Sequence, residues 1–279
     1  MNIRKVLRQY GLRPSKGLGQ NFLESEPVLW RIVEASEVGP ADTVIEIGPG
    51  LGQLTEELLA RAHHVIAVEL DRKMVAILSD RLGQRDHLTL VQGDILETDL
   101  GALMALAKAT PNEGEIRVVA NLPYYITSAA IRHVLESGLR LASVTVMVQR
   151  EVAQRIVAKP GKMSLLAVSV QVYGEPELVC RVPSGAFYPP PKVDSAVLTI
   201  RPHAQPLVSD TLLPTFFRIV QAGFQQKRKQ LHNSLGHGLS LNREQTLSLL
   251  DQADIDPQRR PQMLTINEWG RLAEIVASR

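Results

Sequence analysis

The chain has 279 residues, 44% of them hydrophobic, and a formal net charge of +2 at pH 7. This length suits one large domain, or one domain with a small second one, around a complete core. The single cysteine, Cys180, excludes a disulfide framework and a cysteine-based metal site, and the scattered histidines give no metal-ligand spacing. No apolar run reaches the ~18 residues of a membrane span, and the basic N-terminus lacks the apolar core of a secretory signal. We therefore expect a cytoplasmic protein without a metal. We also expect a monomer.

Between residues 43 and 174, short apolar segments alternate with segments of helical periodicity. Near-continuous apolar strands separated by helices favour an α/β fold with a parallel sheet covered on both faces. The predicted strands are 43–48, 64–71, 88–96, 116–124, 143–149, 165–174 and 196–202. The predicted helices in this region are 53–62, 73–82, 101–109, 128–138 and 150–159.

The pattern changes after Pro202. Residues 203–210 are polar, contain a further proline, and resemble a linker. Beyond them only helical patterns remain, at 212–224, 243–253 and 265–277. We therefore predict two domains, a sheet domain over residues 1–202 and a small all-helical domain over residues 203–279.

A glycine-rich segment, EIGPGLG, follows the first predicted strand and opens a helix. Gly48, Gly50 and Gly52 allow a sharp turn and a close approach to a ligand at the carboxyl edge of the sheet. The dinucleotide fingerprint G-x-G-x-x-G would need a third glycine at position 53, which is Gln53. The observed G-x-G-x-G, preceded by Glu46, resembles instead the first motif of S-adenosylmethionine-dependent methyltransferases. The alternative is a nicotinamide-dependent dehydrogenase. Gln53 argues against it, and so does the lack of an obvious hydride-transfer site in the sequence.

Two carboxylates end the next two predicted strands. Glu69 ends the segment VIAVE, where an acid can accept hydrogen bonds from both hydroxyls of a ribose. Asp94 ends the third strand, in the segment VQGDIL, where it can accept a hydrogen bond from an adenine amino group. A single acid at a strand end is usually only solvated. Together with the glycine loop, however, these acids mark three successive strand ends and predict a pocket for a nucleoside cofactor.

The fourth strand ends in the tetrapeptide NLPY, residues 121–124. It resembles the (D/N/S)-x-P-(Y/F) motif of methyltransferases that act on planar exocyclic amines. The amide oxygen of Asn121 and the carbonyl of Leu122, made reachable by Pro123, can hold the two N–H groups of an adenine amine. These bonds favour a pyramidal nitrogen whose lone pair points at the methyl group, which is orientation and electrostatic stabilisation. Tyr124 offers a stacking face worth roughly 1–3 kcal/mol per base, which helps offset the cost of extruding the base.

Three further segments point to one family. They are KGLGQNFL at 16–23, FYPPPKVDSAV at 187–197 and FQQKRKQLHNSL at 224–235. Together with the four motifs above, in this order, they give the chain a close resemblance to the ribosomal RNA adenine dimethyltransferases that act on the small subunit, the KsgA group. The resemblance covers roughly residues 10–270, nearly the whole chain.

This resemblance implies a Rossmann-like methyltransferase sheet with a C-terminal all-helical domain. It implies that the protein uses S-adenosylmethionine to dimethylate two adjacent adenines in a hairpin loop near the 3′ end of small-subunit (16S) rRNA, in an assembling small ribosomal subunit. Phe187 would stack on the target adenine opposite Tyr124. The cofactor-binding residues implied by the matching motifs are Asn21, Leu23, Gly48, Glu69, Asp94 and Asn121.

Two basic clusters predict contacts to RNA phosphates. One lies in the N-terminal arm, residues 1–23, which contains no acid, and includes Arg13 and Lys16. The other is Lys227, Arg228 and Lys229. Either cluster alone is more simply a solvated surface, whereas two beside a candidate pocket favour a polyanion. The family commonly has arginine at the first position of the second cluster; lysine keeps the charge but lacks the planar fork.

Two alternatives remain for the substrate and the activity. Related resistance-type enzymes dimethylate one adenine of large-subunit rRNA and usually have isoleucine where this chain has Leu122. Other related proteins are non-catalytic nucleic-acid-binding factors, which the intact Asn121, Pro123 and Tyr124 argue against. The two basic clusters also suggest a role as an assembly checkpoint for the small subunit.

Overall fold

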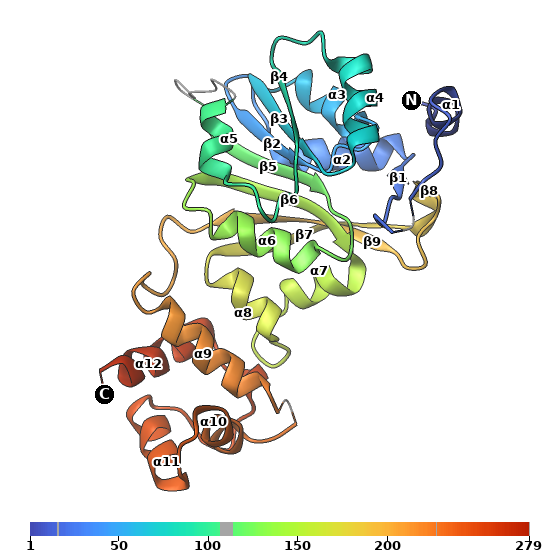
Figure 1. Cartoon of the computed structure of the whole chain (residues 1–279). Coiled ribbons are helices and arrows are strands. Elements are labelled where there is room, and N and C mark those ends of the chain that lie inside the picture. The colour runs from blue at the N-terminus through green and yellow to red at the C-terminus, as the bar shows by residue number, and fades with distance from the viewer. Residues whose placement is uncertain (16, 107–113, 227, 279) are drawn as a thin grey trace. The chain divides into compact units, whose positions relative to one another are not determined.

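The computed structural model describes residues 1–15, 17–106, 114–226 and 228–278. The chain forms two compact units (Figure 1). The first comprises Met1–Ala153 and Glu177–Pro202, and the second Gln154–Pro176 and His203–Arg279. No helix in the described ranges combines the length and the apolar character that crossing a membrane requires.

A seven-stranded sheet forms the centre of the first unit, in the order β4-β3-β2-β5-β6-β9-β7. The strands from β4 to β6 pair in parallel, whereas β9 runs antiparallel to β6. The sheet is therefore mixed, whereas the sequence predicted a parallel one. The antiparallel direction of β9 was missed because a buried apolar run has the same pattern in either direction. The strands of this sheet are β2 (Thr43–Ile47), β3 (His64–Glu69), β4 (Leu88–Gln92), β5 (Ile116–Asn121), β6 (Leu141–Gln149), β7 (Gly174–Val182) and β9 (Ser195–Pro202).

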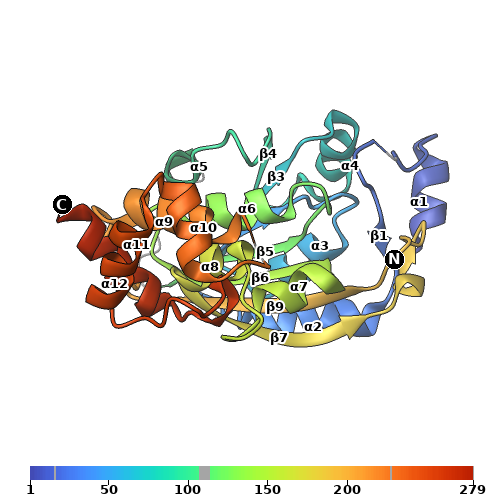
Figure 2. The ribbon, with the colours of Figure 1, turned by 90° about the horizontal axis from the view of Figure 1, so that it is seen from below.

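Helices cover both faces of this sheet, which is why its central strands are apolar throughout. Helix α2 lies on one face, in contact with β5, β6 and β9, and helix α6 lies on the other (Figures 1 and 2). All five residues of β2 are buried. The helices of this part of the chain are α1 (Ile3–Gln9), α2 (Glu26–Ser36), α3 (Gln53–Leu59), α4 (Arg72–Leu82), α5 (Leu100–Leu106), α6 (Thr127–Leu135) and α7 (Arg150–Ile156).

A separate two-stranded ribbon joins distant parts of the chain. Strand β1 (Phe22–Leu23) pairs antiparallel with β8 (Phe187–Tyr188). In this register Leu23 lies opposite Phe187. The ribbon brings the end of the N-terminal arm against the segment that precedes β9.

The prediction of a strand at residues 165–174 is wrong. Helix α8 (Leu165–Gln171) begins there, capped by Ser164, whose hydroxyl accepts a hydrogen bond from the Ala167 N–H at 3.2 Å. An apolar run of this length is compatible with a strand or with a buried helix, so periodicity alone did not separate them. The next strand of the sheet is β7, which was not predicted. The last residues of the predicted helix 101–109 lie outside the described residues.

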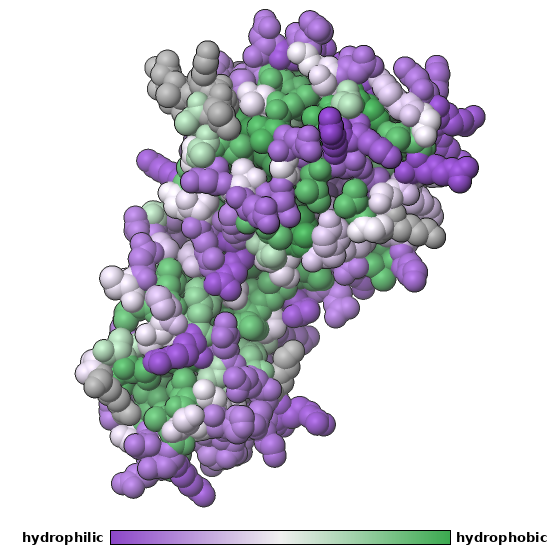
Figure 3. Space-filling view, in the orientation of Figure 1, coloured by the Kyte–Doolittle hydropathy of each residue, from purple (hydrophilic) through white to green (hydrophobic). Residues whose placement is uncertain are grey.

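Four helices dominate the second unit: α9 (Leu213–Phe224), α10 (Leu231–Leu239), α11 (Arg243–Gln252) and α12 (Ile266–Ala277). Helix α9 contacts α10 and α12, and the fully buried Trp269 packs so closely on Gly223 that an added Cβ would lie 2.4 Å from its ring. The segment 154–176 belongs to this unit because α8 packs on α9. The division into domains at residues 202 and 203 stays a prediction. Polar side chains cover much of the surface of each unit in the view of Figure 3.

Candidate active site

The order of the strands reverses between β2 and β5. From β2 the chain continues to β3 on one side, and from β5 it continues to β6 on the other. In open α/β sheets the crevice at the carboxyl ends of such strands is where ligands bind. A pocket lies at this position. The predicted site residues that line it are Asn21, Leu23, Gly48, Glu69, Asn121, Leu122, Pro123, Tyr124 and Phe187.

The glycine loop forms one wall of the pocket in a backbone conformation that favours glycine. Gly48, Gly50 and Gly52 have φ angles of 69°, 57° and 83°. An added Cβ would lie 2.7 Å from a methyl group of Leu78 at Gly52, and 3.3 Å from the ring of Phe22 at Gly50. The glycines therefore allow the loop to pass between helix α4 and the N-terminal arm.

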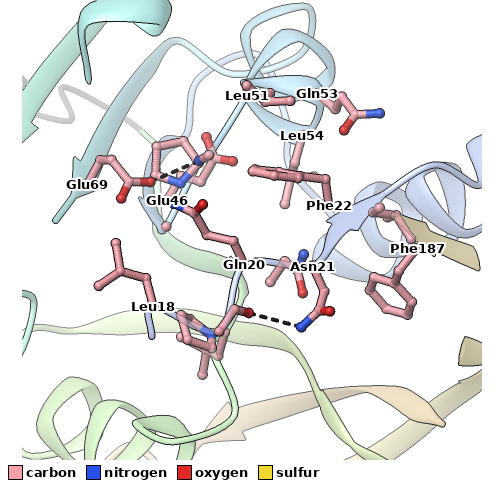
Figure 4. Close-up of a pocket in the computed structure, with 18 of the residues that line it drawn as sticks. Leu18, Gln20, Asn21, Phe22, Glu46, Leu51, Gln53, Leu54, Glu69 and Phe187 are labelled. Carbon is pink, nitrogen blue, oxygen red and sulfur yellow. Dashed lines mark hydrogen bonds between the residues drawn. The ribbon is translucent and has the colours of Figure 1, made fainter. Parts of the chain in front are cut away.

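Glu69, at the end of β3, ties this loop to the sheet. Its Oε2 accepts a hydrogen bond from the Gly50 N–H at 3.0 Å (Figure 4), and its Oε1 accepts one from the Asp71 N–H at 2.9 Å. Burial raises the pKa of Glu69, while the two N–H donors oppose that shift by favouring the carboxylate. The carboxylate thus shapes the glycine loop, in addition to the ribose contact that the sequence suggests.

Asp94 follows β4 and lies at the same edge of the sheet. Its Oδ1 accepts a hydrogen bond from the Leu96 N–H at 2.9 Å. The preceding residue, Gly93, donates its N–H to the carbonyl of Glu69 at 3.0 Å, which holds the two strand ends together. Asp94 is not among the described residues that line the pocket, so its contact with an adenine stays a prediction.

The tetrapeptide NLPY lies directly against the glycine loop. Asn121 is the last residue of β5, and the Leu122 N–H donates to the carbonyl of Met147 on β6 at 3.2 Å. A Cβ added at Gly48 would lie 3.9 Å from the Asn121 carbonyl oxygen and 4.0 Å from Cδ of Pro123. The structure therefore brings together the two motifs that the sequence places some seventy residues apart.

Two aromatic rings line the same pocket. The hydroxyl of Tyr124 hydrogen-bonds to Oγ of the buried Ser195 at 2.7 Å, and burial raises the pKa of this phenol. Phe187 is 3% exposed and pairs with Leu23 across the β1–β8 ribbon. In Figure 4, Phe187 and Asn21 lie across the pocket from Glu69. Stacking of the target adenine between Tyr124 and Phe187 stays a prediction.

The N-terminal arm is a structural part of the pocket as well as a basic segment. It forms helix α1 and then lines the pocket with residues 18–23, where Gln20 donates from Nε2 to Asp71 at 2.9 Å. The apolar positions 3, 6, 7 and 10 are one helical face and are the signal that could have predicted α1. The buried residues that join the arm to the glycine loop and α4 are Ile3, Leu7, Phe22, Leu51, Met74 and Ile77.

The structure describes three of the five residues predicted to bind RNA. Arg13, in the first unit, is exposed. Arg228 and Lys229, in the second unit, are exposed before helix α10. Lys16 and Lys227 lie outside the described residues. No group of histidine, cysteine, aspartate and glutamate suited to a metal is found among the residues that the structure describes.

Glu46, noted only as the residue before the glycines, is a pocket residue that sequence reasoning did not assign. It is 1% exposed in the middle of the sheet, and within the described ranges its Oε2 has no hydrogen-bond partner. Burial raises its pKa to about 8; the nearby Thr55 hydroxyl opposes this shift and the charge of Glu69 adds to it. A glutamate inside an otherwise apolar strand, TVIEI, is the signal that could have singled it out.

These residues fit a cofactor that carries a ribose and a charged amino-acid end. The Glu69 carboxylate at the strand end can accept hydroxyl groups, the glycine loop allows close backbone approach, and the unpartnered acid of Glu46 can meet a cation. Residues 121–124 offer acceptor oxygens and an aromatic face beside the same space.

Several known proteins are similar to the chain. The 23S rRNA methyltransferase ErmE has a solved structure with a TM-score of 0.70 and 30% identity, covering 91% of this chain and 98% of that one. A dimethyladenosine transferase from Plasmodium falciparum shares the fold, with a TM-score of 0.75 and 24% identity over 92% of this chain and 98% of that one. Two relatives are called ribosomal RNA small subunit methyltransferase A. The one from Dehalococcoides mccartyi strain CBDB1 is 46% identical, over 96% of this chain and 90% of the relative. The one from Moorella thermoacetica is 45% identical, over 97% of this chain and 95% of the relative.

The fold and the pocket define an S-adenosylmethionine-dependent methyltransferase of the Rossmann-like type. The model of the family described as ribosomal RNA adenine dimethylase matches residues 12–275. The chain belongs to this family, and it is therefore an enzyme that methylates adenines of ribosomal RNA. This confirms the resemblance seen in the sequence and excludes the nicotinamide-dependent dehydrogenase.

Proposed function

We propose that the protein transfers methyl groups from S-adenosylmethionine to two adjacent adenines in a hairpin loop near the 3′ end of small-subunit (16S) rRNA. The products would be dimethyladenines, formed during assembly of the small subunit, by a monomer in the cytoplasm. The observation that carries the chemistry is the close contact of residues 121–124 with the glycine loop. The choice of the small subunit is supported by the relatives at 46% and 45% identity, whose name gives that substrate.

The target amine would be held by Asn121 and Leu122. An exocyclic amine is a weak nucleophile because its lone pair is delocalised into the ring. Two acceptor oxygens fixed at the end of a buried strand favour the pyramidal form, in which the lone pair is available, without any strong base. Tyr124 would present its ring to the base, and the hydrogen bond of its hydroxyl to Ser195 fixes the orientation of that ring.

The cofactor, which supplies the methyl group, would lie against the glycine loop. Glu69 would accept the ribose hydroxyls and Asp94 the adenine amine, while Gly48 leaves room for close approach. Asn21 and Leu23 would close the pocket from the N-terminal arm, which lines it opposite Glu69. Phe187 would complete the space for the target base from the other strand of the ribbon.

The direct test is transfer of tritium from labelled S-adenosylmethionine to small ribosomal subunits that lack the modification, with large subunits in parallel. We expect label in small subunits alone, recovered as dimethyladenine after digestion of the RNA. Label in large subunits would move the assignment to the activity that the name of ErmE states, which the 30% identity to that structure makes the main alternative. Absence of label with retained binding to the particle would indicate a non-catalytic assembly factor.

A second expected result concerns the basic residues of the helical unit. Replacing Arg228 and Lys229 by alanine should weaken RNA binding and leave cofactor affinity unchanged, because both side chains are exposed in the unit that does not contain the pocket. The slope of log affinity against log salt should flatten by about 0.7 per lost contact to single-stranded RNA. Filter binding at several salt concentrations measures this slope. Arg85→Ala, at another exposed arginine, is the matched control, and an unchanged slope in the double variant would mean that these charges only face solvent.

A further inference from the structure

Glu46 is an acid in a position where an ionised side chain is costly. It lies in β2, between Ala67 of β3 and Val119 of β5 in the register of the sheet, and it is 1% exposed. Acidic side chains are almost never fully buried unless they are paired, because burial removes the hydration of the charge. Within the described residues, Oε2 of Glu46 accepts no hydrogen bond.

The groups that face Glu46 do not supply a positive charge. The neighbouring strands present apolar residues, helix α3 presents the hydroxyl of Thr55, which lowers the pKa of Glu46 only in part, and the end of β3 presents the second acid, Glu69. Burial accordingly raises the pKa of Glu46 to about 8, and Glu69 adds to this. Burial without a cationic partner therefore favours the neutral form of Glu46 at and below neutral pH before any ligand enters.

Glu46 and Glu69 are adjacent acids with different hydrogen-bond environments. Two backbone N–H groups donate to Glu69, which favours its carboxylate. Glu46 has no such donor at Oε2. When two neighbouring acids differ in this way, the proton resides on the one with fewer donors. Both residues belong to the lining of the pocket and lie on the same side of it in Figure 4.

We propose that Glu46 is a further cofactor-binding residue, protonated in the free enzyme, which releases its proton to solvent when the ammonium group of the cofactor enters the pocket. The inference rests on the proposed use of S-adenosylmethionine. The O–H bond of the Glu46 carboxyl breaks, the proton passes to the buffer, and the carboxylate pairs with the ammonium. A buried carboxylate that is costly alone is stabilised beside a cation, because the attraction between the two charges offsets the cost of removing the carboxylate from water.

The test is isothermal titration calorimetry at pH 6.5, in two buffers with different enthalpies of ionisation. The ligand is S-adenosylhomocysteine, which keeps the ammonium but has no sulfonium charge and cannot react. At this pH an amino group stays protonated, since its pKa is ordinarily about 7.7–8.0. We expect close to one proton released per ligand bound by the parent enzyme, and close to none by Glu46→Gln.

Glu69→Gln is the matched variant, because it removes the neighbouring acid. It should bind the ligand more weakly but still release the proton. The assignment to Glu46 would be overturned if Glu46→Gln still released the proton. It would also be overturned if Glu69→Gln lost the release while Glu46→Gln kept it. Release with S-adenosylmethionine but not with S-adenosylhomocysteine would overturn the pairing with the ammonium, and would indicate the sulfonium instead. Failure of the parent enzyme to bind either compound would contradict the proposed function and not only this inference.

The pH dependence of affinity gives a second readout. Between pH 6 and 7.5 the Kd of the parent enzyme should fall by up to about tenfold per pH unit, because less energy is needed to remove the proton as the pH rises. In Glu46→Gln the Kd should be higher and nearly independent of pH in this range. A parent enzyme whose Kd is constant over this range would contradict the proposal.

The free enzyme provides a control for folding of the variant. An acid whose pKa is raised by folding stabilises the native state below its ordinary pKa of 4.5, and that contribution is lost as the pH rises toward about 8. The midpoint of thermal unfolding without ligand should therefore fall with pH more steeply in the parent than in Glu46→Gln. Equal slopes would mean that Glu46 is already ionised in the free enzyme, against the proposal.

Discussion

Replacing Asn121 by alanine should lower the rate of adenine methylation by about 10²–10³-fold, the usual cost of removing one group that stabilises charge in a transition state. Asn121 ends β5 beside the glycine loop, so the sheet fixes its backbone before any substrate binds, and the residue lines the pocket. Without it, the amine keeps one acceptor and is no longer held in the reactive geometry. Single-turnover transfer of labelled methyl to unmodified small subunits measures the effect.

Asn121→Asp is the control for the effect on Asn121, because it retains an acceptor oxygen at the same position. It should keep much more activity than the alanine variant, while binding of the ribosomal particle is unchanged in both. If the alanine variant retained more than about a tenth of the parent rate, the proposed hold on the amine would be wrong, since the loss would be smaller than that of one ordinary transition-state contact.

Replacing Glu69 by alanine should weaken binding of S-adenosylhomocysteine by about 10²-fold or more. Hydrogen bonds to a charged group are each worth about 1.5–3 kcal/mol, and this carboxylate accepts two from the backbone, at 3.0 Å from Gly50 and 2.9 Å from Asp71. Its removal takes away the ribose contact and also releases the glycine loop. Calorimetric titration measures the Kd.

The matched control is Glu57→Ala. Glu57 is 43% exposed in its side chain and pairs with Arg61 at 2.9 Å one helical turn away, a surface ion pair of small value. Its loss should leave the Kd for S-adenosylhomocysteine unchanged. An unchanged Kd in Glu69→Ala as well would mean that neither the loop contact nor a ribose contact depends on this carboxylate.

The pocket could be predicted because its residues follow strong local patterns. The glycine loop, Glu69 and residues 121–124 each end a continuous apolar strand, and the parallel order of those strands places their ends at one edge of the sheet. Most of the predicted site residues accordingly line one pocket. Asp94 has the same pattern after β4, the edge strand of the sheet, but it lies outside the described lining.

Other parts of the fold could not be read from local patterns. The ribbon strands β1 and β8 have two residues each, too few to show any alternation. Helix α10 was not predicted because its sequence LHNSLGHGL is rich in residues of low helix propensity, and its apolar residues are held by packing on α9. The raised pKa of Glu46 depends on burial between two strands and near a second acid, which only the tertiary structure provides.

The β1–β8 ribbon has a consequence for synthesis of the protein on the ribosome. Leu23 is made early and Phe187 much later, yet the two residues pair in the ribbon and line the same pocket. Pairing between segments so distant in the sequence forms late in folding, because the long loop must close first. A nascent chain that has not yet passed residue 187 therefore lacks a finished pocket, even though the glycine loop and residues 121–124 have already emerged. Completion of most of the chain is thus a condition for binding cofactor and substrate together.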